Sequence, residues 1–336
     1  MKVTSEKVVI IALGCNLVIF ATKGVAAWLS GSSALFSETL HSLADSLNSV
    51  LLLIGIRRAA MPPDRRHPFG YTRAIYFWSF LGAVFMFGVI ASGSIYRGYE
   101  QILYSSEIHH ISWALATLVA SIILESVAVF YAIRGLRLSS RPVNGRKTGV
   151  LASFRESGDP AVKLVFVEDF LSLSGVLMAF GGLLAVHFFG APKLDGFTAV
   201  AIGLLIGVLA VYLMNENRKK LLGESASPRM EEDIRKHAMT DPEIHNVLSL
   251  KTIQVGANKV MAYLVVELEP DLAVEDVDDI TYNLEKRIIR EIPEVIDCFI
   301  EVVATTCEPC KERIKKQDGW MFKGKQKEVD EFADSR

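Results

Sequence analysis

Six long apolar runs constrain this chain more than any other feature of its sequence. They cover about residues 8–30, 34–56, 74–98, 112–135, 162–188 and 196–214. Each run reaches the roughly 20 residues that a helix needs to cross the apolar core of a bilayer. Strands are not expected, because a backbone in lipid must satisfy its hydrogen bonds within the segment. The sequence therefore predicts an all-α six-helix transmembrane bundle.

Basic residues alternate between the loops of this bundle. They gather at the N-terminus, in the 57–73 loop, in the 134–163 loop and after the sixth run, whereas the intervening loops carry almost none. Cytoplasmic loops of membrane proteins carry the excess of Lys and Arg. We therefore expect both termini to be cytoplasmic, in a multi-pass protein of the cell (inner) membrane.

Composition excludes several classes of protein. Hydrophobic residues make up 51% of the chain, above globular usage, and the formal charge of −2 gives no indication of a nucleic-acid partner. The four cysteines are too few and too scattered for a secreted disulfide framework. No nucleophile elbow, HExxH motif or phosphate-cradling glycine loop is present, so neither an enzyme nor a cofactor is expected.

The stretch SETLHSLADSLN, residues 37–48, places three ionisable groups in the second apolar run: Glu38, His41 and Asp45. Hydrocarbon penalises such groups unless they have partners, and intramembrane ionisable residues are functional by default. His41 and Asp45 are four residues apart and project from one helix face. An imidazole and a carboxylate there form half of a divalent-metal site. The alternative is a His–Asp hydrogen bond that locks two helices together.

A second acidic cluster lies in the fifth run, where Glu168 and Asp169 are adjacent in VFVEDFLSLSG. Neighbouring residues diverge by about 100° on a helix, so at most one should point squarely into a site shared with the second run. Two adjacent acids in lipid require a cation or protons to neutralise them. Pairing with Lys23 remains an alternative for one of them.

Two further charges stand alone in apolar surroundings. Lys23 lies in the first run and Glu125 in the fourth, within SIILESVAVFY. Lys23 either snorkels to the nearer surface or pairs with an acid on a neighbouring helix. Glu125 is the obvious partner, and we interpret both residues as structural.

The remaining histidines of the membrane part are in loops. His67 is in the 57–73 loop, and His109 and His110 follow Glu107 between the third and fourth runs. They could contact metal, but solvated loop residues are the more usual interpretation.

The C-terminal third predicts a small soluble domain. Amphipathic helices are expected over residues 229–240 and 274–291, and alternation predicts strands over 246–255, 259–268 and 294–304, with 256–258 as a hairpin turn. The predicted organisation is a transmembrane domain at 1–220, a cytoplasmic α+β (α-β-β-α-β) domain at 225–305, and a charged, disordered tail at 306–336. The core is small, so dimerisation is expected.

Cys307 and Cys310 follow the last predicted strand as a CxxC pair. One such pair is half a zinc site or a redox pair, and neither has its usual context. A surface thiol pair is the favoured interpretation, and regulatory metal binding is the alternative.

Taken together, these motifs resemble the cation diffusion facilitator family. The resemblance covers roughly residues 8–304 and is most specific in SETLHSLADSLN, in HPFGYTRAIYFW and in the Glu-Asp pair followed by Gly175. The Glu-Asp pair and LLGESASP are most similar to the zinc transporter nine-like branch, which has bacterial members.

This resemblance implies a homodimer, joined through a ferredoxin- or metallochaperone-like domain. The resemblance also implies export of Zn²⁺ or a similar divalent cation from the cytosol, driven by inward proton flow. Matching motifs imply that His41, Asp45 and Asp169 are metal ligands. Val165 stands where the family often has His or Asp, so Glu168, Asn48 or water completes the set.

The identity of the ion and the role of the protein stay open at this point. Fewer imidazoles and more oxygen ligands shift preference from Zn²⁺ toward Mn²⁺ or Fe²⁺, and Co²⁺ and Ni²⁺ are further alternatives. A non-transporting membrane metal sensor or scaffold is the alternative of a different class. In the small domain His237, His245 and Cys298 are weak metal candidates, each more typical of an ordinary surface or core residue.

Overall fold

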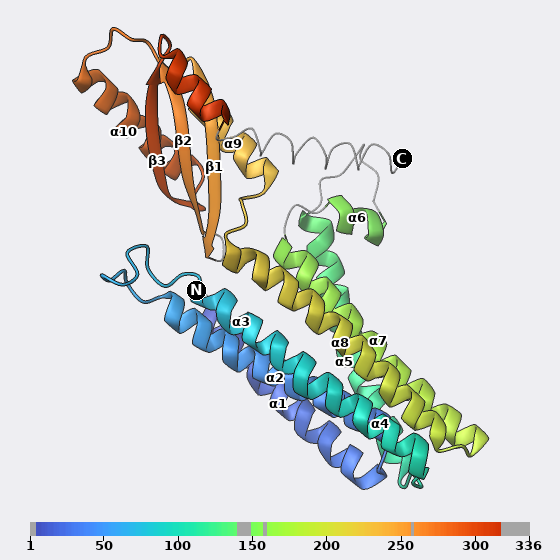
Figure 1. The fold of residues 1–336 in the computed structure, drawn as a ribbon. Coiled ribbons are helices and arrows are strands. Elements are labelled where there is room, and N and C mark those ends of the chain that lie inside the picture. Colours follow the sequence, from blue (N-terminus) through green and yellow to red (C-terminus); the bar gives the residue numbers. More distant parts are fainter. Residues whose placement is uncertain (1–4, 140–148, 157–159, 257–258, 317–336) are drawn as a thin grey trace. The chain divides into compact units, whose positions relative to one another are not determined.

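The computed structural model describes residues 5–139, 149–156, 160–256 and 259–316. The chain divides into two compact units, Met1–Leu221 and Leu222–Arg336. The ribbon of each unit is shown in Figure 1.

The first unit is a bundle of long helices, and the six-span prediction is confirmed. Within the described residues, six helices are long and apolar enough to cross a membrane. They are α1 (Ser5–Ser30), α2 (Ser33–Ala59), a third span over Ala74–Tyr104, α5 (Ile111–Ser139), α7 (Pro160–Phe189) and α8 (Lys193–Leu222).

The third span is not one regular α-helix. It consists of α3 (Ala74–Phe85), the π-helix η1 (Met86–Ala91) and α4 (Ser92–Tyr104). A π-helical turn inside an α-helix frequently marks a functional site, because it redirects side chains. A short helix, α6 (Val150–Glu156), precedes α7 and was not expected from the sequence.

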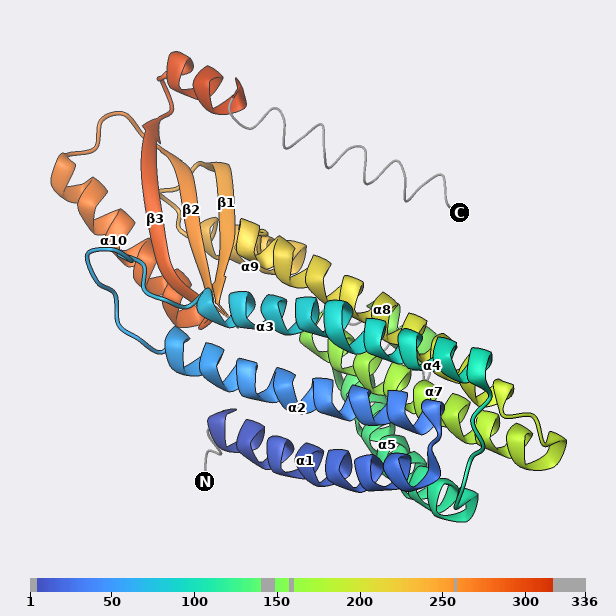
Figure 2. The ribbon, with the colours of Figure 1, turned by 60° about the horizontal axis from the view of Figure 1, so that its bottom comes forward.

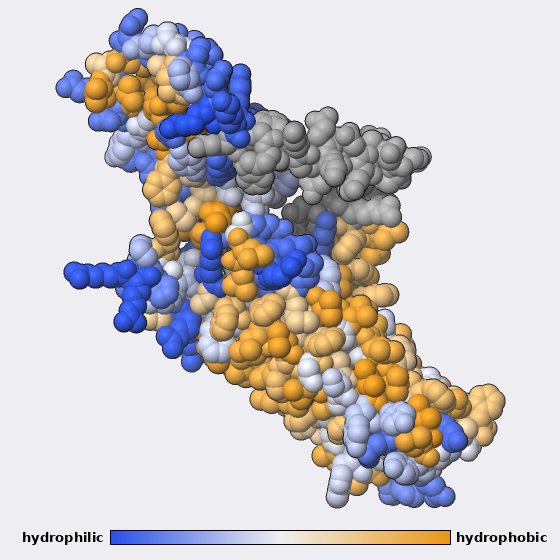
Figure 3. All heavy atoms as spheres, viewed as in Figure 1, coloured by the Kyte–Doolittle hydropathy of each residue, from blue (hydrophilic) through white to orange (hydrophobic). Residues whose placement is uncertain are grey.

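Large apolar side chains cover the outside of the long helices. Figure 3 shows hydrophobic residues gathered over the bundle and hydrophilic residues over the small C-terminal unit. Exposed examples are Val18, Trp28, Phe130, Leu138, Phe188 and Val208. A soluble monomer rarely exposes so extensive an apolar surface. With the six apolar helices, this surface marks a multi-pass membrane protein.

Small residues bring two of the helices into backbone contact. A Cβ atom added to Gly98 of α4 would lie 2.7 Å from the carbonyl oxygen of Gly196 on α8. Any larger side chain at either position would separate the helices. Such close approach is the usual basis of helix association in a bilayer.

The second unit is the α+β domain expected from the sequence. Its elements are α9 (Pro228–Ala238), β1 (Asn246–Gly256), β2 (Lys259–Leu268), α10 (Val274–Glu291) and β3 (Val295–Ala304). Figure 2 shows β2 between β1, its antiparallel neighbour, and β3, its parallel neighbour. Ser227 caps α9, with its Oγ accepting from the N–H of Met230 at 3.3 Å. Residues 257–258 of the expected hairpin turn lie outside the described residues.

Alternation along β2 gives the sheet two apolar faces. Ala262 and Leu264 pack with Leu284 of α10 in the larger core. Val265, on the opposite face, packs with Val303 and Ile314. Ile314 belongs to a C-terminal helix, residues 308–316, within the stretch that was expected to be disordered. The expectation was wrong for that helix because burial of Ile314 on the second face stabilises it; residues 317–336 lie outside the described residues.

Candidate functional site

A cavity of about 310 Å³ lies within the helical bundle. Its polar lining comes from α1, α2, α5 and α7, and η1 and α8 add apolar side chains. The lining includes all five residues that the sequence predicted as metal ligands. The polar side chains are Asn16, His41, Asp45, Asn48, Ser49, Glu125, Glu168, Asp169 and Ser172.

Helix α2 contributes the imidazole and one carboxylate. Nε2 of His41 lies 3.8 Å from Oδ2 of Asp45, as their spacing of four residues predicts. The His41 side chain is 7% exposed, whereas that of Asp45 is 38% exposed. Asn48 follows one turn later, and Gly82 on α3 leaves room for its amide, because a Cβ there would lie 3.2 Å from Asn48 Oδ1.

Helix α7 contributes two adjacent carboxylates. Glu168 and Asp169 both line the cavity. The expectation that at most one of them points squarely into a site shared with α2 stays a prediction, because lining a cavity does not fix the direction of a side chain. Val165 is half-exposed and is not among the lining residues.

Glu125 also lines the cavity, which the sequence did not predict. It was interpreted as the structural partner of Lys23, but it lines the cavity beside Glu168 and Asp169. Lys23 instead donates to Oε2 of Glu38 at 3.0 Å, in a pair whose side chains are 0% and 1% exposed. The sequence does mark Glu125 as unusual, because it is an isolated acid in an apolar run. Which residues lie next to Glu125 depends on how α5 packs against the other helices.

The lining groups surround the cavity without closing on a common point. Among the described residues, no three His, Cys, Asp or Glu side chains are close enough to hold one ion together. Binding of a cation therefore requires the side chains to converge from the walls. One imidazole with several carboxylates is a donor set for a divalent cation of intermediate to hard character.

His67 belongs to a separate network at the membrane edge. The backbone N–H groups of Arg66 and His67 and the hydroxyl of Tyr71 all donate to the carboxylate of Asp64, at 2.8, 2.6 and 2.6 Å. The Tyr71 hydrogen bond, more than the others, lowers the pKa of Asp64, and the same bond raises the pKa of Tyr71. This network orders the 57–73 loop and places His67 outside the cavity lining. Glu107, His109 and His110 are likewise exposed loop residues.

The weak metal candidates of the small domain do not form a set among the described residues. His237 is hydrogen-bonded through Nδ1 to the carbonyl oxygen of Asp233 at 2.7 Å, and His245 pairs with Glu269 at 2.5 Å. Cys298 is buried in the larger core, and this burial raises the pKa of its thiol to about 12. A thiol with so high a pKa is a poor metal ligand.

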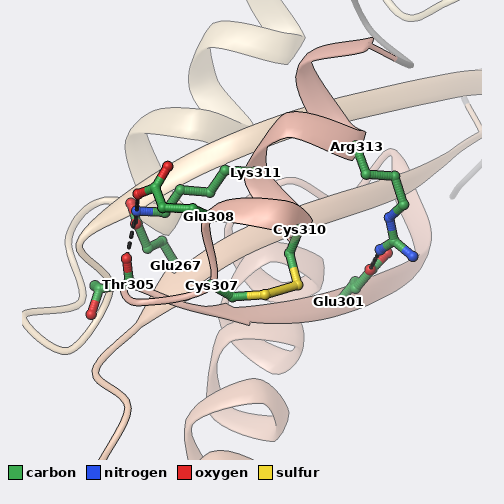
Figure 4. Close-up of a disulfide and its surroundings, with 8 residues drawn as sticks. All are labelled: Glu267, Glu301, Thr305, Cys307, Glu308, Cys310, Lys311 and Arg313. Carbon is green, nitrogen blue, oxygen red and sulfur yellow. Dashed lines mark hydrogen bonds and ion pairs between the residues drawn. A yellow bond between two sulfur atoms is a disulfide. The ribbon is translucent and has the colours of Figure 1, made fainter.

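Cys307 and Cys310 are joined in a disulfide at the start of the C-terminal helix. Figure 4 shows the bridge between Lys311, which contacts Glu267, and Arg313, which contacts Glu301. Both sulfur atoms pack against the second face of the sheet. The favoured interpretation as a surface thiol pair was wrong, because folding of this helix brings the two cysteines into bonding distance.

Two family descriptions cover nearly all of the described chain. Residues 9–222 match "Cation efflux transmembrane domain", and residues 226–303 match "Cation efflux protein, cytoplasmic domain". The chain belongs to the cation efflux family. This confirms the resemblance to the cation diffusion facilitators, whose members are transporters and not enzymes.

Relatives within the cation efflux family carry names for different metals. A Xenopus laevis protein named "Proton-coupled zinc antiporter SLC30A9, mitochondrial" is 32% identical over 254 residues, covering 76% of this chain and 45% of that protein. The Bacillus subtilis "Manganese efflux system protein MneP" is 22% identical over 302 residues, covering 89% of this chain and 95% of that protein. The chain thus spans less than half the length of the zinc antiporter.

Among solved structures, a variant of MamM CTD is similar to part of this cation efflux protein. The match covers 23% of this chain and 92% of the MamM CTD chain. The identity is 18% and the TM-score 0.22.

Proposed function

We propose that this protein exports a divalent cation, in the first place Zn²⁺, from the cytosol in exchange for protons. The observation that carries the proposal is the cavity of about 310 Å³ within six membrane-spanning helices, lined by one imidazole and four carboxylates. Ionisable groups are expensive in a bilayer unless they serve ions or protons.

In this proposal His41, Asp45 and Asp169 bind the cation, and Glu168 or Asn48 completes the set. The name of the Xenopus relative supports Zn²⁺, and the name of the Bacillus relative supports Mn²⁺ as the alternative cargo. The oxygen-rich lining also suits Mn²⁺ and Fe²⁺, so discrimination against these ions should be weak compared with a site of several imidazoles.

Proton exchange follows from the chemistry of the same ligands. A metal binds the deprotonated forms of imidazole and carboxylate, so protons and metal compete for them. When the helices rock to open the cavity outward, protons displace the ion. When the cavity opens inward, the protons leave and a new ion binds.

The loop charges support a location in the cell (inner) membrane with both termini in the cytoplasm. The match of residues 226–303 to the cytoplasmic domain supports a homodimer joined through that domain. Its small core agrees with this assembly, because a second copy would bury further apolar surface.

Metal uptake into proteoliposomes tests the proposal. His41→Ala and Asp45→Ala should abolish Zn²⁺ uptake, while His109→Ala, a change at an exposed loop histidine, should leave it unchanged. All three variants should elute as the wild-type dimer does. Competition with Mn²⁺, Fe²⁺, Co²⁺ and Ni²⁺ ranks the ions.

Two outcomes would overturn the proposal. Wild-type uptake by both cavity variants would exclude this cavity as the transport site. Saturable metal binding without flux and without a change of pH inside the vesicles would indicate a sensor or scaffold instead.

A further inference from the structure

Glu38 and His41 are neighbours on one face of α2. One carboxylate oxygen of Glu38 and one ring nitrogen of His41 have no hydrogen-bond partner among the residues that the structure describes. The two residues are three positions apart, and both are buried. Within the described part of the chain, Oε1 of Glu38 and Nδ1 of His41 are buried and have no hydrogen-bond partner. Buried polar atoms of this kind require explanation, because each costs free energy unless it is hydrogen-bonded.

Both residues line a second, smaller cavity. Its volume is about 10 Å³, and the rest of its lining is apolar apart from Gly175. That volume is on the order of what one water molecule needs. His41 and Leu209 line both this small cavity and the 310 Å³ cavity, and His41 is the ionisable residue common to the two linings.

Gly175 of α7 lies beside the buried free oxygen of Glu38, and both residues line the small cavity. A Cβ atom added to Gly175 would lie 2.6 Å from Oε1 of Glu38, closer than such atoms can approach. The other oxygen, Oε2, accepts from Lys23 at 3.0 Å. Lys23 thus holds the carboxylate, and glycine at 175 keeps its second oxygen unobstructed.

The two ring nitrogens of His41 have different surroundings. Nε2 is 3.8 Å from Asp45 Oδ2, beside the larger cavity, whereas Nδ1 is the buried atom without a partner. A histidine that binds metal through one nitrogen donates its other N–H to a carboxylate, a carbonyl or a water. This second contact sets the tautomer and the orientation of the ring.

We propose that Glu38 is the positioning residue for His41. One water molecule in the small cavity accepts the Nδ1–H of His41 and donates to Oε1 of Glu38. The imidazole is thereby held with the lone pair of Nε2 toward the transported cation. Lys23 fixes Glu38, so α1 supports the site without contributing a ligand. This inference rests on the proposed function, because it assigns His41 to the cation.

The test measures Zn²⁺ affinity of the purified full-length protein by titration calorimetry. Lys23→Met/Glu38→Met replaces the ion pair with apolar side chains of similar volume, a change that often preserves the fold. Affinity should fall by about 10- to 100-fold, as for other outer partners of metal-binding histidines. Lys23→Met/Glu38→Gln keeps a hydrogen-bonding group at position 38 and should recover part of the loss.

A glycine pair on α7 provides a matched control that leaves every charge in place. Gly175→Ala should weaken Zn²⁺ binding, because the new methyl group displaces Oε1 of Glu38. Gly181→Ala, on the same helix, should bind as the wild type does, since nothing lies within 4 Å of its Cβ position.

A spectroscopic measurement separates positioning from general destabilisation. In metal-free protein with ¹⁵N-labelled histidine, the resonances of His41, assigned by their loss in His41→Ala, should report one tautomer protonated at Nδ1. The Lys23→Met/Glu38→Met variant should show a mixture of tautomers. A single unchanged tautomer in that variant would overturn the proposal.

The outcomes also distinguish this inference from the proposed function. Affinity within twofold of the wild type in Lys23→Met/Glu38→Met or in Gly175→Ala, together with loss of binding in His41→Ala, would overturn the positioning role alone. Equal weakening of both double variants would overturn it too, because then only the ion pair matters. Wild-type affinity in both His41→Ala and Asp45→Ala would overturn the proposed function itself.

Discussion

Asp195 at the start of α8 caps the start of α2, although Ser32 and Asp195 are 163 residues apart in the sequence. The hydroxyl of Ser32 donates to Oδ1 of Asp195 at 2.6 Å, and the N–H of Ser33 donates to Oδ2 at 2.5 Å. Asp195 is 0% exposed. One buried carboxylate therefore satisfies donors at the N-terminus of another helix, where the helix dipole also favours a negative charge.

Asp195→Ala should destabilise the bundle by about 1–3 kcal/mol, because it leaves buried donors of Ser32 and Ser33 without an acceptor. The temperature at which the detergent-solubilised protein loses its monodisperse elution measures the effect. Glu107→Ala, at an exposed loop acid, is the control and should not change it. Equal midpoints for the two variants would show that water replaces the carboxylate at no cost.

Glu125→Gln should raise the Zn²⁺ concentration for half-maximal uptake by about 10-fold, the lower end of the effect of removing a group that supports a metal site. The reason is electrostatic, since the variant removes one of four carboxylates around the cavity. Proteoliposome uptake measures the change, with Glu107→Gln as the exposed control. Uptake kinetics equal to those of the wild type would indicate that Glu125 has a structural role only.

The Asp64 network predicts a pH dependence of the loop between α2 and α3. The pKa of Asp64 is lowered from its ordinary 3.8, chiefly by the hydrogen bond from Tyr71. A lowered folded-state pKa adds stability that is complete above the ordinary value and is lost as pH falls through the lowered one. The loop should therefore remain ordered at neutral pH and loosen in acid below that ordinary value.

Tyr71→Phe removes the largest cause of this shift, so the pKa of Asp64 should rise toward its ordinary value. Carboxyl ¹³C shifts of aspartate-labelled protein, recorded against pH, measure the pKa, and Asp64→Asn assigns the signal. An identical titration curve in Tyr71→Phe would show that the backbone N–H groups alone set the pKa.

The disulfide should add modestly to the stability of the C-terminal helix and should not affect transport. Cys307 and Cys310 are three residues apart, and closing so short a loop stabilises by about 2 kcal/mol in the chain-entropy treatment. In Cys307→Ser/Cys310→Ser, hydrogen exchange of residues 308–316 should become faster, while β2 stays protected and Zn²⁺ uptake is unchanged. A reductant should accelerate exchange in the wild type only. Loss of uptake would instead indicate that this helix couples to transport.

Features with local causes could be derived from the sequence alone. The length of an apolar run decides whether it can span a bilayer, so all six helices were predicted. Their starts agree within a few residues, but the third span extends to Tyr104 and the sixth to Leu222, beyond the predicted ends at 98 and 214. The spacing of His41 and Asp45 places them on one face of any helix. Alternation along residues 259–268 likewise predicts β2 and its two faces, because side chains of a strand alternate with a period of two.

Partner choice between helices was decided only by the tertiary structure. Lys23 pairs with Glu38 and not with Glu125, both acids of α7 reach one cavity, and Asp195 caps a distant helix. The rotation and depth of each helix against its neighbours set these relationships. They depend on contacts such as that of Gly98 with Gly196, between positions far apart in the chain. Hydrophobic periodicity carries little of this information in a bilayer, because lipid and protein interior are similarly apolar.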